Sequence, residues 1–154
     1  MKNLVNIQIR QIYILIEIIS VLLICLFVYT GISKLNEHNN FQGVLSQSPL
    51  IGAMSNFLSW LIPILELFTA LLLFFPFARK WGLFISLILM TIFTLYVFYM
   101  IVFIPHLPCS CGGVIKLLTW KEHLLFNIFF SVIALLGISL YKKTQQRTQN
   151  ALFT

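Results

Sequence analysis

The stretch MSNFLSWLIPILELFTALLLFFPF, residues 54–77, is mostly apolar and contains a single charged side chain, Glu66. An α-helix needs about 20 predominantly apolar residues to cross the hydrocarbon core of a bilayer. The length and composition of this stretch therefore predict a transmembrane helix, and the position of its single carboxyl group raises the question of what an acid does there.

The composition of the whole chain agrees with a membrane protein. Its 154 residues are 60% hydrophobic and 9% charged, with a mean hydropathy of +0.97, whereas about 25% of residues are charged in typical soluble domains. Three further apolar blocks, at about 12–33, 81–104 and 122–141, also have the length of a membrane span. We therefore expect an all-α polytopic membrane protein, a single domain built as a four-transmembrane-helix bundle.

The connections between these blocks have distinct characters. The segment 34–53 is too polar to cross a membrane but carries enough apolar residues to lie on its surface as a short helix. Residues 105–121 form the second long connection, and the polar tail 142–154 is expected to be disordered beyond its first few residues. The first block is longer than the apolar region of a signal peptide and is followed by no small-x-small cleavage site, so we expect it to be retained.

The distribution of basic residues predicts the orientation. With an even number of spans, both termini and the connection between the second and third helices lie on one side. That side holds seven of the ten basic residues, and the other side holds three, Lys34, Lys116 and Lys121. The positive-inside rule then predicts cytoplasmic termini in a bacterial inner membrane, with 34–53 and 105–121 extracytoplasmic. This topology explains the net charge of +6, which is therefore no indication of nucleic-acid binding.

A Cys-Ser-Cys motif, Cys109 and Cys111 in IPHLPCSCGG (104–113), follows the third apolar block. Outside the membrane these thiols would be in a compartment where disulfides persist. A disulfide between them closes a three-residue loop, worth roughly 1.5 kcal/mol on the chain-entropy model, so stabilising the fold is a poor reason to have it. A strained, exposed disulfide is easily reduced. The motif therefore favours a redox pair that exchanges its disulfide.

Other interpretations of the cysteines remain open. The two thiols could bind zinc or copper together with His106, or with His38 or His123, although Cys-x-x-Cys is the more typical zinc spacing. They could also be unused, or each could form a disulfide elsewhere. The third cysteine, Cys25, is predicted to lie within the first helix, where an apolar environment makes a thiol inert.

Glu66 is predicted to lie at the middle of the second helix, about 18 Å from its outer end and too far to act directly on the cysteines. An ionisable group at this depth is costly, which makes it a candidate functional site. It could carry protons, hydrogen-bond a quinone-like molecule, or be a protonated carboxyl bonded to a neighbouring helix. Pro63 should kink the helix and open room beside it. Glu17, nearer the cytoplasm, is expected to pair with Arg10 or Lys80.

Three stretches resemble one protein family: TGISKLNEHNNFQGVLSQSPLIG (30–52), SWLIPILELFTALLLFFP (59–76) and PCSCGGVIKLLTWKEHLLFNIFFSVIALLGI (108–138). They are similar to the bacterial DoxX/MauE group of small four-helix membrane proteins, over residues 29–140. The resemblance implies a redox-associated bundle. Its methylamine-utilisation branch is linked to maturation of methylamine dehydrogenase, a disulfide-rich periplasmic enzyme, alongside a thioredoxin-like protein, and its DoxX branch to thiosulfate oxidation and quinone.

The resemblance carries over to Cys109 and Cys111 as the redox pair and to Glu66 as an intramembrane acid. Together with the motif, the resemblance favours a protein whose partners are the lipid bilayer and a periplasmic thioredoxin-like protein or disulfide-containing client. If the protein is an enzyme, it is expected to be a membrane thiol-disulfide oxidoreductase, with quinone as the candidate cofactor. Segment 34–53 lacks the second cysteine pair with which other four-helix membrane oxidases pass electrons to quinone. The alternative is a non-enzymatic membrane module that binds metal through Cys and His or acts as an assembly partner.

Overall fold

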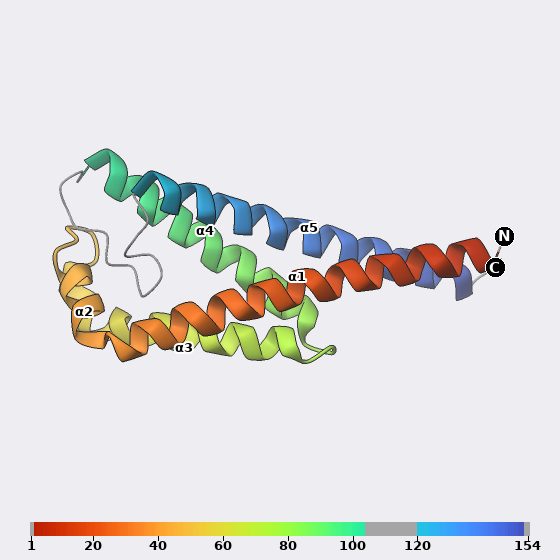
Figure 1. Cartoon of the computed structure of the whole chain (residues 1–154), viewed down its shortest axis with the longest axis horizontal. Coiled ribbons are helices and arrows are strands. Elements are labelled where there is room, and N and C mark those ends of the chain that lie inside the picture. The colour runs from red at the N-terminus through yellow and green to blue at the C-terminus, as the bar shows by residue number, and fades with distance from the viewer. Residues whose placement is uncertain (1, 104–119, 153–154) are drawn as a thin grey trace.

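The computed structural model describes residues 2–103 and 120–152, and every regular element in these ranges is helical. Figure 1 shows their arrangement. In chain order they are α1 (Lys2–Asn36), α2 (His38–Ser46), the short 3₁₀ turn η1 (Gly52–Met54), α3 (Ser55–Phe74), α4 (Arg79–Phe103) and α5 (Trp120–Leu152). The expected all-α fold is confirmed.

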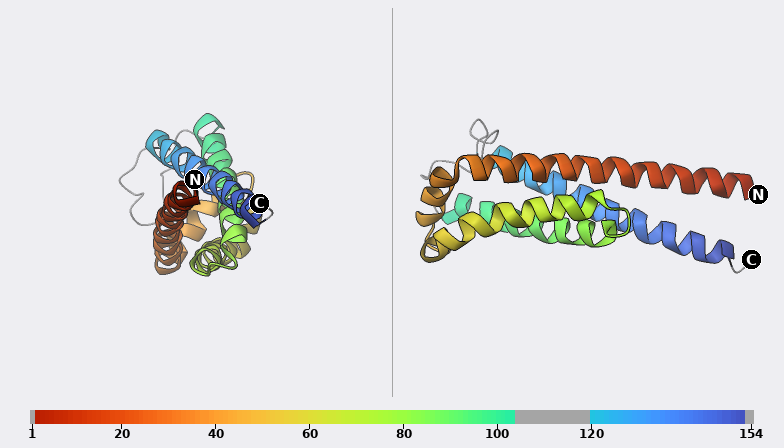
Figure 2. Two further views of the ribbon diagram at one scale, coloured as in Figure 1. Left: turned by 90° about the vertical axis from the view of Figure 1, so that its right-hand side faces the viewer. Right: turned by 90° about the horizontal axis from the view of Figure 1, so that it is seen from below.

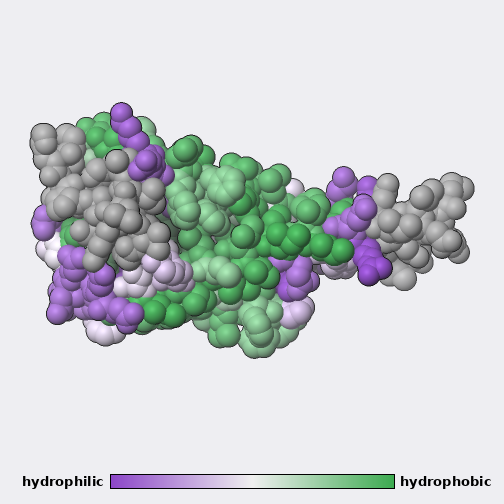
Figure 3. All heavy atoms as spheres, in the orientation of Figure 1, coloured by the Kyte–Doolittle hydropathy of each residue, from purple (hydrophilic) through white to green (hydrophobic). Residues whose placement is uncertain are grey.

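Within the described ranges, four helical stretches are long and apolar enough to span a membrane. These are Arg10–Asn36, Gly52–Phe74, Arg79–Phe103 and Lys121–Arg147. Large apolar side chains such as Phe57, Phe68 and Phe74 are more than half exposed on the outside of the bundle, and hydrophobic residues cover the middle of the molecule in Figure 3. A soluble protein would not leave so much apolar surface in contact with water, so the helices are membrane spans surrounded by lipid.

The bundle consists of two helix pairs. α1 packs most extensively against α3, and α4 against α5, while α3 and α4 meet near the short turn that joins them and diverge towards α2 (Figure 1). Gly82 allows this meeting, because a Cβ atom there would lie only 2.8 Å from the backbone nitrogen of Leu73. The apolar core runs through all four spans and consists of Leu23, Phe27, Ala70, Leu73, Leu83, Leu89, Met90 and Ala134.

α2 crosses one end of the bundle, which we call the α2 end. Its sequence HNNFQGVLS places Phe41, Val44 and Leu45 on one face, and all three side chains are buried against the bundle. This spacing of three and four residues is that of an amphipathic helix. Segment 34–53 begins with the last residues of α1, which ends at Asn36. α2 follows after one residue.

The two terminal helices are longer than expected. α1 begins at Lys2 and α5 ends at Leu152, so that both extend beyond α3 and α4 at the end of the bundle that holds the two termini (Figure 2). The prediction that the tail from residue 142 is largely disordered was wrong. The sequence KKTQQRTQNAL contains no Gly or Pro and is rich in residues that tolerate a helix, so the helix of the fourth span continues through it.

The α2 end also contains the C-terminal end of α4 and the N-terminal end of α5 (Figure 1). The sequence between them includes Cys109 and Cys111, which lie outside the described residues. The two helices that flank this segment in the sequence therefore meet α2 at the same end of the bundle.

Candidate functional site

A buried ion pair joins α1 to α3. Nζ of Lys34, in the last turn of α1, lies 2.7 Å from Oε1 of Glu66 in the middle of α3, and the two side chains are only 9% and 1% exposed. At this distance the contact is a charge-assisted hydrogen bond. A charge in the interior of a membrane bundle is costly unless it is paired, and here each charged group is the partner of the other.

Gly31 explains how the two helices come close enough for this pair. A Cβ atom at Gly31 would lie 3.1 Å from Cγ of Leu67 and 3.4 Å from the carbonyl oxygen of Pro63, so the helices touch at this point. Small residues permit such close approach between membrane helices. Lys34 is one helical turn after Gly31, and Glu66 precedes Leu67, which places the charged groups beside this contact.

Two aromatic rings complete the surroundings of the Lys34 ammonium. Nζ lies 5.8 Å from the ring centroid of Phe41 in α2 and 5.7 Å from that of Phe93 in α4. Both distances are within the range of cation–π attraction. Lys34 therefore contacts groups from α2, α3 and α4, and it ties the α1/α3 pair to the helix that crosses the end of the bundle.

A cavity of about 310 Å³ lies next to the ion pair, between the two helix pairs. Most of its walls are apolar and come from all five α-helices. The polar lining is concentrated in six residues: Thr30, Lys34, Glu66, Tyr96, His123 and Asn127. Glu66 and Lys34 belong to the α1/α3 pair and His123 and Asn127 to α5, so polar groups enter the cavity from both sides.

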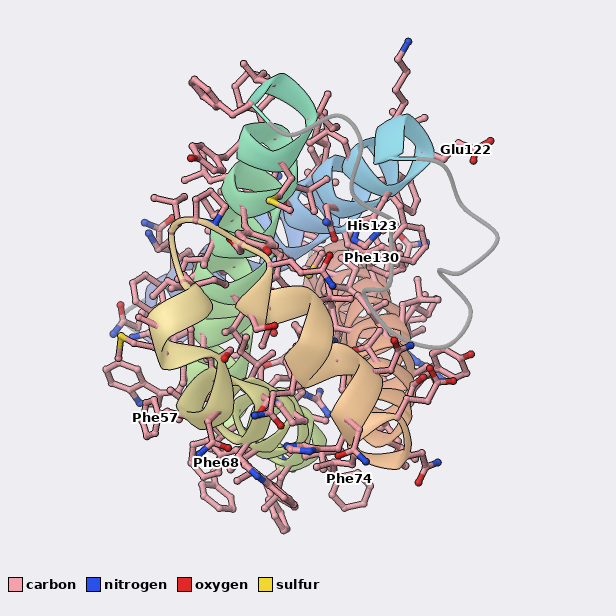
Figure 4. All side chains as sticks on the ribbon, turned by 90° about the vertical axis from the view of Figure 1, so that its left-hand side faces the viewer. Phe57, Phe68, Phe74, Glu122, His123 and Phe130 are labelled. Atoms are coloured by element: carbon pink, nitrogen blue, oxygen red, sulfur yellow. The ribbon has the colours of Figure 1, made fainter. Side chains whose placement is uncertain are left out.

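Two polar atoms in this cavity have no hydrogen-bond partner among the residues that the structure describes, Oε2 of Glu66 and Nδ2 of Asn127. The side chains are buried, with Glu66 1% and Asn127 4% exposed. His123, 5% exposed and one turn before Asn127, is directed towards the bundle, whereas its neighbour Glu122 points outward (Figure 4). The cavity thus presents both an acceptor and a donor to whatever occupies it.

Of the predicted site residues, the structure describes Glu66, which is bonded to a neighbouring helix. It is held there by an ion pair with Lys34, not as the protonated carboxyl that was one of the expected arrangements. Cys109, Cys111 and His106 lie outside the described residues, so their relation to Glu66 stays a prediction. Cys25 is exposed on the outer face of α1. His38 packs against Trp60, with ring centroids 4.3 Å apart.

No group of three or more His, Cys, Asp or Glu side chains in the described ranges could hold a metal ion.

The predicted partner of Glu17 was wrong. Its carboxylate lies 3.3 Å from the guanidinium of Arg79, at the far end of the bundle from the cavity, and contacts neither Arg10 nor Lys80. Arg79 begins α4, so this second pair links α1 to α4.

The sequence did not predict Lys34 as the partner of Glu66, or His123 and Asn127 as residues that line the same cavity. Lys34 was assigned to the loop after the first helix, because a basic residue usually marks the end of a span. The signal that could have placed it is Gly31, one turn earlier, since a small residue in a membrane helix indicates close packing against another helix.

Four membrane-spanning helices around a buried ion pair and a largely apolar cavity define a small polytopic membrane protein. The model of the family "Methylamine utilisation protein MauE" matches residues 12–140. The chain therefore belongs to the MauE family, as its sequence motifs predict. No curated protein and no solved structure matches it.

Proposed function

We propose that this MauE-family protein carries out thiol–disulfide exchange through Cys109 and Cys111, on the extracytoplasmic side of the bacterial inner membrane. Its partner is a periplasmic thioredoxin-like protein or a client that acquires disulfides, and the exchange supports maturation of periplasmic proteins used in methylamine utilisation. The observation that carries the proposal is the Cys-Ser-Cys spacing directly after a transmembrane helix, in a chain of the MauE family.

The chemistry conserves atoms and electrons. One cysteine of the pair, as a thiolate, attacks a sulfur of the partner's disulfide, which forms a mixed disulfide and releases the partner's other thiolate. The second cysteine then attacks its neighbour's sulfur in the mixed disulfide, closing the Cys109–Cys111 bond and releasing the reduced partner. Two electrons pass to the partner in this direction, and the same steps in reverse oxidise it.

The three-residue disulfide ring suits this exchange. A bond that adds little to fold stability and is strained by its tight turn is readily reopened, because its reduction relieves strain. Gly112 and Gly113 follow the motif, and glycine adopts the dihedral angles that a tight turn requires. The proposed orientation places this bond in the periplasm, where disulfides persist.

Thiol trapping in membranes tests the proposal. Membranes are treated with a maleimide mass tag, with and without reductant, for the unsubstituted protein and for Cys109→Ser, Cys111→Ser and Cys25→Ser. We expect the tag to be excluded from the pair until reductant is added. One of the two single variants of the motif should accumulate a mixed disulfide with a periplasmic protein.

Cys25→Ser is the matched control, because it also removes one thiol but lies on the outer face of α1. It should accumulate no mixed disulfide. If Cys109 and Cys111 stay reduced in membranes and become protected from the tag by zinc or copper, exchange is contradicted and a metal-binding module takes its place.

A further inference from the structure

A groove of about 240 Å³ lies on the outside of the bundle between α4 and α5. It shares no lining residue with the cavity beside Glu66. We propose that this groove, together with Lys80 and Lys142 near one of its ends, binds an anionic phospholipid from the leaflet on the side of the chain termini. The proposal depends on the membrane spans and is independent of the proposed function.

The groove presents a hydrocarbon surface, although Thr91, Thr94 and Ser131 carry hydroxyl groups. Each of these hydroxyls donates a hydrogen bond to the backbone carbonyl four residues earlier in its own helix. Large apolar side chains such as Leu95 and Val132 line the groove and are exposed on the outside of the bundle. Because the hydroxyl donors are already used, the groove suits an apolar chain better than a polar ligand.

Two lysines lie in register with the groove. Lys80 precedes Leu87 by seven residues, and Lys142 follows Leu135 by seven, and both leucines line the groove. Seven residues are almost two full helical turns, so each lysine lies on the face of its helix that holds the leucine, about 10 Å further towards the termini. Both lysine side chains are exposed. The groove therefore has a cation from each wall at the same end.

The two lysines also lie at nearly the same level of the bundle. α4 and α5 touch at Gly137, where a Cβ atom would lie 3.0 Å from Cδ2 of Leu83. Lys80 is three residues from Leu83 and Lys142 is five residues from Gly137, both towards the termini. At the helical rise per residue, their levels differ by about 3 Å. Since lysine side chains are long and flexible, one phosphate group can contact both ammonium groups.

Neither helix supplies a carboxylate at this end. α4 contains no Asp or Glu, and the single acid of α5, Glu122, is in its first turn at the opposite end. Glu17 of α1 lies at the same end as the lysines but is bonded to Arg79. Basic residues between membrane helices at the surface of a leaflet attract anionic headgroups. The charge therefore favours an anionic lipid over a zwitterionic one.

The depth of the groove suits the end of an acyl tail. Along α4 the groove runs from Leu87 to Leu95, which is about 10–22 Å from Lys80. The midplane of a hydrocarbon core about 30 Å thick lies about 15 Å below its surface. A lipid with its phosphate at the two lysines would thus place the end of one tail in the groove.

A second copy of this chain fits the groove less well. A membrane dimer with a twofold axis along the membrane normal would bring Lys80 and Lys142 of both copies to one level. Such like-charge juxtaposition opposes association. A phospholipid has the opposite charge at that level.

Native mass spectrometry of the full-length protein in detergent tests the proposal, because it resolves the first bound lipid. The probes are phosphatidylglycerol and phosphatidylcholine with identical oleoyl chains. We expect phosphatidylglycerol to bind roughly twentyfold more tightly, since each lysine contributes about fivefold. Lys80→Gln and Lys142→Gln should each weaken its binding about fivefold, and Lys80→Gln/Lys142→Gln should remove the preference.

Lys121→Gln is the matched control for charge, because Lys121 is also exposed on α5 but lies at its opposite end. It should bind both lipids as the unsubstituted protein does. Val132→Phe fills the groove and should weaken phosphatidylglycerol binding severalfold, because the tail loses its packing contacts. Leu136→Phe adds the same ring at an exposed position of α5 that does not line the groove, so it should have no effect. Thermal unfolding checks that each variant folds.

The proposal is overturned if the two lipids bind equally tightly, or if Lys80→Gln/Lys142→Gln binds phosphatidylglycerol as tightly as Lys121→Gln does. Equal binding by Val132→Phe and Leu136→Phe would also overturn it, because the tail would then lie elsewhere. Thr91→Cys, with the three native cysteines replaced by Ser, tests for a second copy in the groove. Disulfide-linked dimers of this variant in membranes would show that another chain, and not a lipid, covers the groove.

Discussion

Nζ of Lys34 lies 2.7 Å from Oε1 of Glu66, and both side chains are almost completely buried between α1 and α3. Each group is tolerable in the membrane interior because the other is present. The pair therefore holds the end of α1 at a fixed level against α3, and it forms one wall of the cavity.

Removing one partner of this pair should cost more than removing both. Lys34→Met leaves an unpaired buried carboxylate and should lower the free energy of unfolding by about 3 kcal/mol. Lys34→Met/Glu66→Leu leaves no charge behind and should recover most of that loss. Unfolding by denaturant in detergent micelles measures both. Equal stability of the single and double variants would mean that Lys34 does not compensate Glu66.

The close approach of α3 and α4 can be tested at a glycine. In Gly82→Ala the added Cβ would lie 2.8 Å from the backbone nitrogen of Leu73 and within 3.0 Å of its side chain, so the helices must move apart. We expect a loss of about 2 kcal/mol, typical of overpacking. Thermal unfolding of the detergent-solubilised protein provides the measurement.

Gly43→Ala is the matched control in α2. A Cβ atom there meets nothing within 4 Å, and Ala stabilises a helix relative to Gly by roughly 0.5–1 kcal/mol. This variant should be as stable as the unsubstituted protein or slightly more so. If both substitutions have the same effect, the contact of α4 with α3 at Gly82 is not tight.

Much of the fold could be predicted from the sequence, because a bilayer imposes a length and a polarity on every span. The four apolar blocks, separated by residues such as Arg79 and Lys80, correspond to four candidate spans. Hydropathy says nothing of where a helix ends outside the membrane. Hydropathy therefore did not predict the helical extension of α5 beyond Lys142. That extension depends on helix propensity, in particular on the absence of Gly and Pro from the tail.

The candidate site was predictable only in part. Glu66 stands out because a carboxyl group in a membrane span is rare and costly. The sequence does not identify Lys34 as the partner of Glu66, because a lysine at the end of a span usually directs its long side chain outward to the interface. Lys34 instead points inward, and only the packing of Gly31 against α3 reveals this. Asn127 and His123 become notable only once the cavity between the helix pairs is known.

The attachment of α2 to the bundle should depend on Phe41. Its ring is 5% exposed, lines the cavity and lies 5.8 Å from Nζ of Lys34. Phe41→Ala removes both the packing and the cation–π contact, so it should cost about 3 kcal/mol and make α2 sensitive to protease. Limited proteolysis of the protein in nanodiscs, followed by mass spectrometry, measures the second effect.

Asn39→Ala truncates an exposed side chain in the same helix and serves as the control. It should change stability by less than about 0.5 kcal/mol and leave α2 protected. Equal cleavage of the two variants would show that the buried face of α2 does not hold it in place.

The proposed orientation has a direct test in intact cells. Seven of the ten basic residues are predicted to lie on the side of the termini, so Cys109 and Cys111 should be extracytoplasmic. In a Cys25→Ser background, reduced cells exposed to a membrane-impermeant maleimide should show labelling of the pair. Gln145→Cys, with both motif cysteines replaced by Ser, introduces one thiol at an exposed position of α5 on the opposite end of the bundle. It should be labelled only after the membrane is permeabilised, because a charged reagent cannot cross the hydrocarbon core.

Labelling of Gln145→Cys, and not of the pair, in intact cells would show that the topology is the reverse of the proposed one. The cysteines would then face the reducing cytoplasm, where a strained disulfide would not persist, and the exchange proposed for them would have to be abandoned.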